Sequence, residues 1–340
     1  MVEWAVGNNT HQPANTRLDS IMTVAYPIAG IDVAKHSLDL AVLDADQNCA
    51  SSSLASDEDA LKKLAQRLLA KGVRLVVLEA TGGLEVAVML ALEAKGIAVA
   101  RINPQRVRDF AKGLGWLAKT DRIDARLLAI YGERMRPMPT PLANEKHRLL
   151  KELVARRKQL VDARSKEKTR SHQCCNDFVR RSIAELISHF DAQIAKVESA
   201  IDELVDNEPV MAKKRKIMLS FCGVGAQSAN AILAYLPELG VIGHKKASAL
   251  VGVAPFSNDS ATRLGKRRTA GGRTELRQML YMAVQTGYRY NPRLKPLYLR
   301  LRDRGRTHKC ALIACLNKMI KLLTAILKTE TPLMAQNQEV

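Results

Sequence analysis

Hydrophobic and polar residues change their spacing twice along this 340-residue chain. From about residue 26 to residue 131, short apolar runs alternate with amphipathic stretches. Each run is continuous or alternates with period two, which predicts strands at "YPIAGID", "SLDLAVLD", "NCASSSLA", "VRLVVLEA" and "IAVARIN". Helices are predicted for "DEDALKKLAQRLLAKG", for residues 84–95 and for a segment that starts near Asp121. This order indicates an α/β domain.

The spacing changes beyond the Pro-rich stretch "RPMPTPL", residues 136–142. Apolar residues then follow one another in steps of 4 and 3 at Ile183, Ile187, Phe190, Ile194, Val197, Ile201 and Leu204. A 3.5-residue repeat held over three heptads predicts a coiled-coil seam. The Arg- and Lys-rich stretch 144–170 is a candidate antiparallel mate within the chain, and oligomerisation through the seam is the alternative.

The third part, residues 213–328, is predicted to be mainly helical. It opens with "KKRKIMLSFCGVGAQSANAILAYL", in which a Gly-Val-Gly turn between two helices is similar to a phosphate-binding helix-hairpin-helix. A helix-turn with no ligand explains this stretch nearly as well. A basic, Gly-rich loop between two helices follows, and residues 309–327 predict a long amphipathic helix. The predicted divisions are a disordered tail (1–23), an α/β domain (24–136), a coiled-coil connector (143–207) and a helical domain (212–330).

Charge indicates a polyanionic partner. Lys and Arg number 53 against 34 acids, which gives a formal net charge of +19. Nucleic acid is the simplest such partner, and a basic enzyme with a solvated surface is the alternative. Aromatic residues make up only 4% of the chain, which argues against the stacking platforms of single-strand-binding sheets.

Composition also bears on location and on metals. The six cysteines include no C-x-x-C pair and no matching histidines, which argues against a zinc site, and free thiols suit a reducing cytoplasm. The longest apolar runs are far shorter than the roughly 20 residues of a membrane span. The first residues lack the pattern of a signal peptide. We therefore expect a cytoplasmic protein with no membrane partner.

Four acids in the α/β domain stand where metal ligands could converge. Asp32 ends the first predicted strand, Glu79 ends the buried strand "LVVLE", and Asp121 and Asp124 share one helix face at positions i and i+3. The predicted order of elements matches the ribonuclease H-like fold. Because a desolvated acid needs a partner for its charge, a pair of Mg²⁺ or Mn²⁺ ions would suit this set.

The alternative for Asp121 and Asp124 is a helix start, with Thr120 as N-cap and an acid in the first turn. Three further acids are nearby, and we interpret them as solvated or capping: Asp39, Asp44 and Glu85.

Four stretches together resemble the insertion sequence one-ten family of transposases, the DEDD transposases related to Piv-type DNA invertases. They are "GIDVAKHSLDLAV", "VVLEATGG", "INPQRVRDFAKGLGWLAKTDRIDARLLA" and "VAPFSNDSATRLGKRRTAGGRTELRQMLYMA". The resemblance covers about residues 24–327. It implies a RuvC-like domain, a coiled-coil connector and a helical C-terminal transposase domain. It also implies that the DEDD metal ligands are Asp32, Glu79, Asp121 and Asp124.

In this family the proposed nucleophile is a serine of the C-terminal domain, in a motif that usually reads Pro-x-x-x-x-Ser-Gly. Here "PFSNDSA" matches at Ser260, which is followed by Ala261 in place of glycine. No histidine lies within ten residues of Ser260, so its hydroxyl would need activation from outside its own loop. Ser257 is the second candidate nucleophile, and a turn serine with no chemical role is the structural alternative.

Basic residues around this serine are candidate nucleic-acid ligands. Residues 263–277 contain six Lys and Arg and one acid, a composition suited to holding a scissile phosphate. The predicted nucleic-acid-binding residues are Lys119, Arg263, Lys266, Arg267, Arg268, Arg273 and Arg277.

The resemblance implies a Mg²⁺-dependent transposase or site-specific recombinase that acts on DNA. It further implies a structured guide RNA, the "bridge" RNA of several members, and a homodimer that assembles into a tetramer. Three alternatives remain open. They are a RuvC-like structure-selective nuclease that uses only acids and water, a nucleic-acid-binding remnant without activity, and an actin-like ATPase. "GIDVAK" resembles the first phosphate loop of that last class, but the later Gly-rich nucleotide loops are missing.

Overall fold

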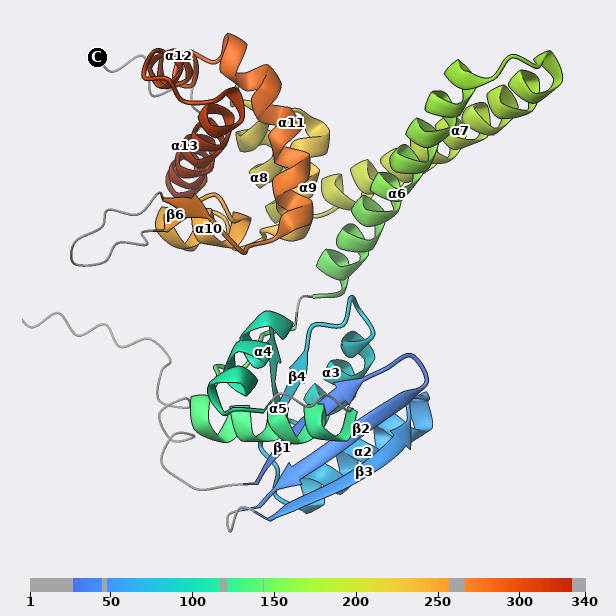
Figure 1. Ribbon diagram of the computed structural model, residues 1–340, viewed down its shortest axis with the longest axis vertical. Helices are drawn as coiled ribbons and strands as arrows, with labels where there is room; N and C mark the ends of the chain where they lie inside the picture. Colours follow the sequence, from blue (N-terminus) through green and yellow to red (C-terminus); the bar gives the residue numbers. More distant parts are fainter. Residues whose placement is uncertain (1–26, 45–47, 117–120, 143, 257–266, 332–340) are drawn as a thin grey trace, which may run out of the picture. The chain divides into compact units, whose positions relative to one another are not determined.

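The computed structural model describes residues 27–44, 48–116, 121–142, 144–256 and 267–331 (Figure 1). Two compact units divide the chain, Met1–Leu142 and Ala143–Val340. In the first unit a sheet packs between helices. The second unit is helical apart from one short pair of strands.

Five strands form the sheet of the first unit, in the order β3-β2-β1-β4-β5. β1 pairs antiparallel with β2 and parallel with β4, β2 pairs antiparallel with β3, and β4 pairs parallel with β5. This strand order and these directions are those of the ribonuclease H-like fold, as the sequence predicted. The strands are β1 (Ile28–Val33), β2 (Ser37–Leu43), β3 (Cys49–Ala55), β4 (Leu75–Glu79) and β5 (Ala98–Ile102).

Helices cover both faces of this sheet, so β1 and β4 are buried almost throughout. The helices α2 (Glu58–Ala70) and α3 (Glu85–Glu93) share a core with Ile31 and Leu78. On the opposite face, α4 (Pro104–Gly113) and α5 (Asp121–Met135) share a core with Ile28 and Val77 (Figure 1). β3 lies at the edge, and its Ser-rich residues are mostly exposed.

The helix α4 was not predicted from the sequence, although a local signal for it is present. Asn103 precedes Pro104, and the Asn103 side chain accepts a hydrogen bond from the Gln105 N–H at 2.8 Å. Asparagine is a favoured N-cap, and proline suits the first turn because its missing N–H needs no partner there. Val107 and Phe110 then join the core beneath the helix.

Two long antiparallel helices open the second unit, α6 (Glu145–Gln173) and α7 (Asp177–Asp206). Arg157 pairs with Glu198 at 2.7 Å and Arg164 pairs with Asp191, so a step of seven residues forward on α6 is seven back on α7. The predicted seam residues are the less exposed positions of α7, with Ile194 and Ile201 fully buried. Supercoiling of this pair into a coiled coil stays a prediction.

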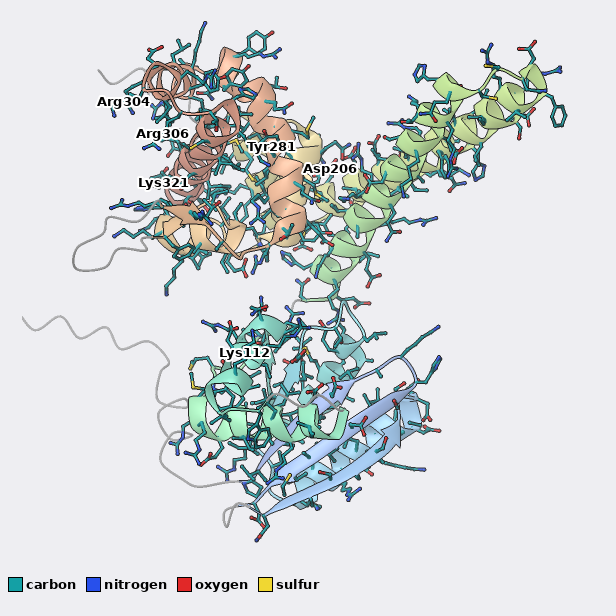
Figure 2. The ribbon with its side chains drawn as sticks, in the orientation of Figure 1. Lys112, Asp206, Tyr281, Arg304, Arg306 and Lys321 are labelled. Atoms are coloured by element: carbon teal, nitrogen blue, oxygen red, sulfur yellow. The ribbon has the colours of Figure 1, made fainter. Side chains whose placement is uncertain are left out.

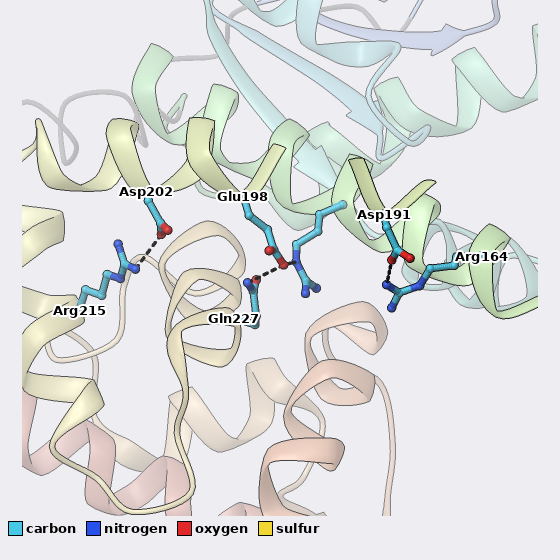
Figure 3. A network of polar contacts seen from close by, with 7 residues as sticks. Arg164, Asp191, Glu198, Asp202, Arg215 and Gln227 are labelled. Carbon is cyan, nitrogen blue, oxygen red and sulfur yellow. Dashed lines mark hydrogen bonds and ion pairs between the residues drawn. The ribbon is translucent and has the colours of Figure 1, made fainter. Parts of the chain in front are cut away.

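Polar contacts join the base of this hairpin to the helices that follow it (Figure 3). Glu198 accepts hydrogen bonds from Arg157 at 2.7 Å and from the Gln227 side chain on α9 at 2.9 Å. Asp202 accepts a hydrogen bond from Arg215 on α8 at 2.7 Å. Arg157 and Arg215 are therefore neutralised by acids of the same unit.

One hydrophobic core joins the hairpin base to the C-terminal helices. Leu150 of α6 and Ile201 of α7 belong to the same buried cluster as Leu316 and Leu323 of α13. The predicted boundary near residues 207–212 thus falls inside one compact unit. The remaining helices are α8 (Pro209–Leu219), α9 (Ala226–Tyr235), α10 (His244–Val251), α11 (Thr274–Tyr290), α12 (Lys295–Asp303) and α13 (His308–Thr329).

Among the described residues, α13 is the one helix long and apolar enough by composition to cross a membrane. Of its most apolar window, 56% is buried inside the unit, and residues such as Leu312 and Met319 are fully enclosed. Such burial is typical of the core helix of a globular domain.

Candidate active site

Two of the predicted metal ligands, Asp32 and Glu79, lie at neighbouring positions of the sheet. The parallel register pairs Gly30 with Val77 and Ile31 with Leu78, so Asp32 and Glu79 are the next positions of β1 and β4. Side chains at matching positions of adjacent strands point to the same face. Both acids therefore share the face of Gly30 and Val77, and both are half-buried.

The helix α5 covers this face and is held against it by glycines. A methyl group added at Gly30 would lie 2.2 Å from the Ala125 carbonyl oxygen and 2.4 Å from the Ala129 nitrogen. At Gly132, a methyl group would lie 2.7 Å from a Val77 methyl and 2.8 Å from an Ile28 methyl. Only glycine permits contacts this close between a helix backbone and a strand.

These two contacts also fix the direction of α5. Gly132 lies over Ile28, and Ala125 lies over Gly30, so α5 runs antiparallel to β1. The next residues in that direction are Asp32 on the strand and Asp124 on the helix. The start of α5, at Asp121, is thus brought to the end of the sheet that carries Asp32 and Glu79, and the Asp121 side chain lies outside the described residues.

A further carboxylate, Asp39, lies in the same row. It is the direct partner of Asp32 in the antiparallel pairing of β1 with β2, and it is half-buried. The interpretation of Asp39 as solvated or capping stays a prediction. Like charges directly opposite each other are unfavourable, so Asp32 and Asp39 together favour a cation at this edge.

The described side chains do not by themselves complete a metal site. No three of their His, Cys, Asp and Glu side chains are close enough to hold an ion. Asp32, Glu79 and Asp124 each have further interactions in the structure, so none of them is free. What the fold does is bring oxygen donors, which Mg²⁺ and Mn²⁺ prefer, to one edge of the sheet.

Glu85 is buried, so it is not a solvated acid, and its carboxylate binds the loop that precedes α3. Only 3% of the residue is exposed. Its carboxylate accepts hydrogen bonds from the Gly83 N–H at 2.8 Å and from the N–H and hydroxyl of Thr81, and Arg101 pairs with it at 3.4 Å. Burial raises the pKa of Glu85, but these backbone and hydroxyl hydrogen bonds lower it more, so the net pKa is lowered. Asp44 has a capping role, because its side chain accepts a hydrogen bond from the Asn48 N–H at 2.7 Å.

The segment that contains both candidate serines lies between two short paired strands of the second unit. β6 (Pro255–Phe256) pairs antiparallel with β7 (Arg268–Thr269), so the chain is brought together on either side of residues 257–266. Several predicted site residues lie outside the described part of the chain: Lys119, Ser257, Ser260, Arg263 and Lys266.

Two predicted nucleic-acid ligands, Arg273 and Arg277, are bound to internal acceptors. Arg273 makes two hydrogen bonds to Glu238, at 2.9 and 2.8 Å, and a third to the Tyr235 carbonyl. Arg277 donates to the carbonyls of Val251, Gly252 and Gly271 at 3.3, 3.3 and 2.6 Å. By contrast, Arg267 and Arg268 are exposed.

The two helices predicted on either side of the Gly-Val-Gly turn are present as α8 and α9. A methyl group at Gly223, in the turn, would lie 2.6 Å from the Gly287 Cα, so the turn packs directly on α11. Buried Asn291 adds a hydrogen bond from its amide to the Cys222 carbonyl at 2.8 Å. A phosphate-binding role of this turn stays a prediction.

Two family models match this chain. Residues 29–179, which contain all four DEDD positions, match the family model of DEDD transposases described as "Transposase". Residues 215–299, which contain Ser260, match the model "Transposase IS116/IS110/IS902 family". The chain belongs to the IS110 family of transposases.

Known relatives of this IS110 transposase include proteins named for DNA inversion. The pilin gene-inverting protein of Moraxella lacunata is 25% identical over 317 residues, which is 89% of this chain and 96% of the relative. That of Moraxella bovis is 26% identical over 242 residues, 69% of this chain and 74% of the relative. An IS110 protein of Streptomyces coelicolor is 26% identical over 159 residues, 46% of this chain and 38% of the relative.

Among solved structures, similarity is found to RuvC of Thermus thermophilus. RuvC in complex with a Holliday junction is 16% identical, covers 34% of this chain and 99% of that chain, and gives a TM-score of 0.26. Another structure of the same RuvC is 17% identical, covers the same shares and gives a TM-score of 0.27. The fold assignment of the IS110 transposase therefore rests on its strand order and register.

Proposed function

We propose that this chain catalyses Mg²⁺- or Mn²⁺-dependent DNA cleavage and strand transfer with a serine nucleophile. The proposed metal ligands are Asp32, Glu79, Asp121 and Asp124, and the proposed nucleophile is Ser260. The observation that carries the proposal is the edge of the sheet where Asp32 and Glu79 occupy adjacent register positions. The contacts of Gly30 and Gly132 direct the Asp124 end of α5 to that edge.

The donor chemistry of this edge fits a hard divalent cation. All four proposed ligands offer carboxylate oxygens, and Asp39 adds a further carboxylate opposite Asp32. When bound, such ions neutralise charge on a scissile phosphate and on the oxygens that attack and leave it. The protein positions its carboxylates on a rigid sheet and helix, so these groups need little rearrangement when the reaction takes place.

The serine step preserves the energy of the broken phosphodiester bond. The Ser260 oxygen would form a bond to the backbone phosphorus while a deoxyribose oxygen leaves with the electron pair and takes up a proton. A later attack by a deoxyribose hydroxyl would reverse this exchange on the new strand and release the serine. Since a serine hydroxyl is a weak nucleophile without an activating group, we propose that the carboxylates and Ser260 are both required for one reaction.

The predicted DNA ligands divide into two groups on the structure. Arg267 and Arg268 are exposed beside the serine segment, and we propose that they hold DNA phosphates, together with Arg263, Lys266 and Lys119. Arg273 and Arg277 hold the ends of that segment on α9, α10 and α11. We propose that these two arginines brace the loop and do not contact DNA.

We further propose that a structured guide RNA selects the DNA, and that the chain acts as a homodimer that assembles into a tetramer. Both points rest on the resemblance to guided members of the family. The net charge of +19 supports a second polyanion besides DNA. DNA inversion is the alternative outcome of the same chemistry, and the two Moraxella relatives with that name support it.

The proposal is tested by cleavage of a DNA substrate that carries the ends of the element, with any RNA that copurifies with the chain. Wild-type protein should cleave with Mg²⁺ or Mn²⁺ and not with EDTA. Asp32→Asn and Ser260→Ala should each abolish cleavage, while binding of the same DNA stays within about threefold. A Ser260→Ala variant that still cleaves four-way junctions would favour the RuvC-like nuclease. Binding without cleavage by wild type under every metal condition would favour the inactive remnant.

A further inference from the structure

A strongly basic surface lies at the end of α11, along α12 and at the start of α13. Residues 288–309 contain eight Lys and Arg and a single acid, Asp303. Figure 2 shows two of these arginines, Arg304 and Arg306, on the outside of the α12–α13 pair. We use the name "α12 cations" for the five exposed members that make no side-chain hydrogen bond or ion pair with the described residues: Lys295, Arg300, Arg304, Arg306 and Lys309.

The α12 cations differ in this respect from several arginines at the α6–α7 hairpin and on α8. Arg157 and Arg164 on α6 and Arg215 on α8 each pair with an acid of α7 (Figure 3). Five uncompensated cations within fifteen residues repel one another and destabilise the folded state. A polyanion that binds across them would remove this repulsion and would gain from the release of its counterions.

The surface is held in one shape by a cluster of rings. Tyr288 of α11 packs on Tyr298 of α12 with their centroids 4.2 Å apart, and the Tyr298 hydroxyl lies 2.7 Å from His308 Nδ1 at the start of α13. The Arg302 guanidinium donates to the Arg306 carbonyl at 2.8 Å and closes the turn after α12. Because three helices are fixed to one another, the α12 cations are positioned before any ligand arrives.

One ring at this surface is turned to solvent. Tyr290, at the end of α11, is 71% exposed and lies five residues before Lys295. Four of the seven tyrosines in the chain fall within residues 281–298, although aromatic residues are scarce elsewhere. An exposed ring beside unpaired cations suits an unpaired nucleic-acid strand, since bases stack on the ring while the cations hold the phosphates. A duplex has its bases stacked internally and would use the cations alone.

We propose that the α12 cations and Tyr290 bind an unpaired nucleic-acid strand, and that these residues are distinct from the proposed metal ligands and Ser260. The low aromatic content predicted no stacking site, and this local concentration of tyrosines revises that expectation for one surface. The proposal depends neither on the metal ligands nor on Ser260, so its outcome can be separated from that of the catalytic proposal.

The test compares binding of a labelled 20-nucleotide single strand, as DNA and as RNA, with the duplex of the same sequence. The full chain is used, and fluorescence anisotropy is measured at several salt concentrations. The triple variant Arg300→Gln/Arg304→Gln/Arg306→Gln should weaken single-strand binding about tenfold or more, and duplex binding should fall as well, because a duplex uses the same cations. Its slope of log affinity against log salt should fall by about 2, since each phosphate contact contributes about 0.7. Tyr290→Ala should weaken single-strand binding at least fivefold with the slope unchanged.

The matched control is Lys63→Gln/Arg67→Gln/Lys71→Gln, which removes three exposed charges from α2 or the residue that caps it. Thermal melting checks that each variant is folded, and the single variants Arg304→Gln and Arg306→Gln replace the triple if it is not. Equal weakening of single-strand and duplex binding by Tyr290→Ala would overturn the proposal in favour of general phosphate attraction. So would an effect no larger than that of the control, or a Tyr290→Ala variant that binds like wild type. The DNA and RNA arms show which strand is the preferred ligand.

Discussion

Asp32 and Asp39 are direct partners across the antiparallel pairing of β1 with β2. Opposite residues of such strands have Cα atoms about 4.5–5.5 Å apart, so two carboxylates share one small region of a half-buried face. With Glu79 at the adjacent position of β4, the row carries three acids. Structural stability alone would not favour three acids this close together, which is why we propose that a cation binds at this edge of the sheet.

The effect of Asp39→Asn on the stability of the protein should change sign when a divalent metal is added. Without divalent ions the variant should be more stable than wild type by about 0.2–1 kcal/mol, because one of two opposed like charges is gone. With Mn²⁺ present, the variant should gain less stability than wild type. The measurement is the melting temperature across a Mn²⁺ titration, with the exposed Asp303→Asn as control. A variant that is destabilised in EDTA would contradict this interpretation.

The close contact at Gly30 predicts that a single methyl group added there would push α5 away from the sheet. Gly30→Ala should destabilise the first unit by about 3 kcal/mol or more, since the new methyl meets backbone atoms that cannot rotate away. Metal-dependent cleavage should be lost with it. Gly113→Ala is the matched control, because nothing lies within 4 Å of the added methyl. Denaturant unfolding measures both, and equal stability of the two variants would show that α5 is not held at Gly30.

The two classes of arginine near the serine segment should respond differently to substitution. Arg277→Gln should destabilise the second unit by about 1–3 kcal/mol, because carbonyls of Val251, Gly252 and Gly271 lose their donor. Arg268→Gln should leave stability within about 0.5 kcal/mol of wild type and weaken DNA binding severalfold. Thermal melting measures the stability of each variant, and titration with DNA measures its binding. Unchanged stability in Arg277→Gln would return that residue to the candidate DNA ligands.

The buried Glu85 carboxylate predicts a stability difference that depends on pH. Its folded-state pKa is lowered, so its contribution is complete above the ordinary pKa of 4.5 and is lost as pH falls through the folded pKa. Glu85→Gln should be about 1–3 kcal/mol less stable than wild type at pH 7, and the two should converge below pH 4.5. Urea unfolding from pH 7 to pH 3 measures this, with the exposed Glu93→Gln as control. A difference in stability between the two proteins that persists at pH 3 would mean that packing, and not the charge of Glu85, causes it.

Much of the first unit could be predicted from its sequence. All five strands and the helices α2, α3 and α5 are where the hydrophobic periodicity places them, because all of them except the exposed edge strand β3 bury apolar side chains. The helix α4 was missed, since its core contacts are few and its Asn-Pro start is a local signal. In the second unit, the 3.5-residue repeat located the buried side of α7.

The roles of individual polar side chains were harder to predict. Asp39 reads as the polar position of an alternating strand, and only the register with β1 shows that it faces Asp32. Arg273 and Arg277 look like DNA ligands in a basic window, but their partners Glu238 and Gly271 are known only from the folded chain. Such contacts join residues far apart in sequence or depend on the geometry of a turn, so spacing along the chain does not reveal them.

The most direct test of the central claim is a measurement of covalent protein–DNA adducts. Element DNA with a labelled strand is incubated with the protein and Mg²⁺, and adducts are resolved on a denaturing gel. Wild type and Ser257→Ala should form an adduct, which protease should remove. Ser260→Ala, Asp32→Asn and wild type in EDTA should form none. An adduct formed by Ser260→Ala, or cleavage by wild type with no adduct at any time point, would contradict the claim that the carboxylates and Ser260 act in one reaction.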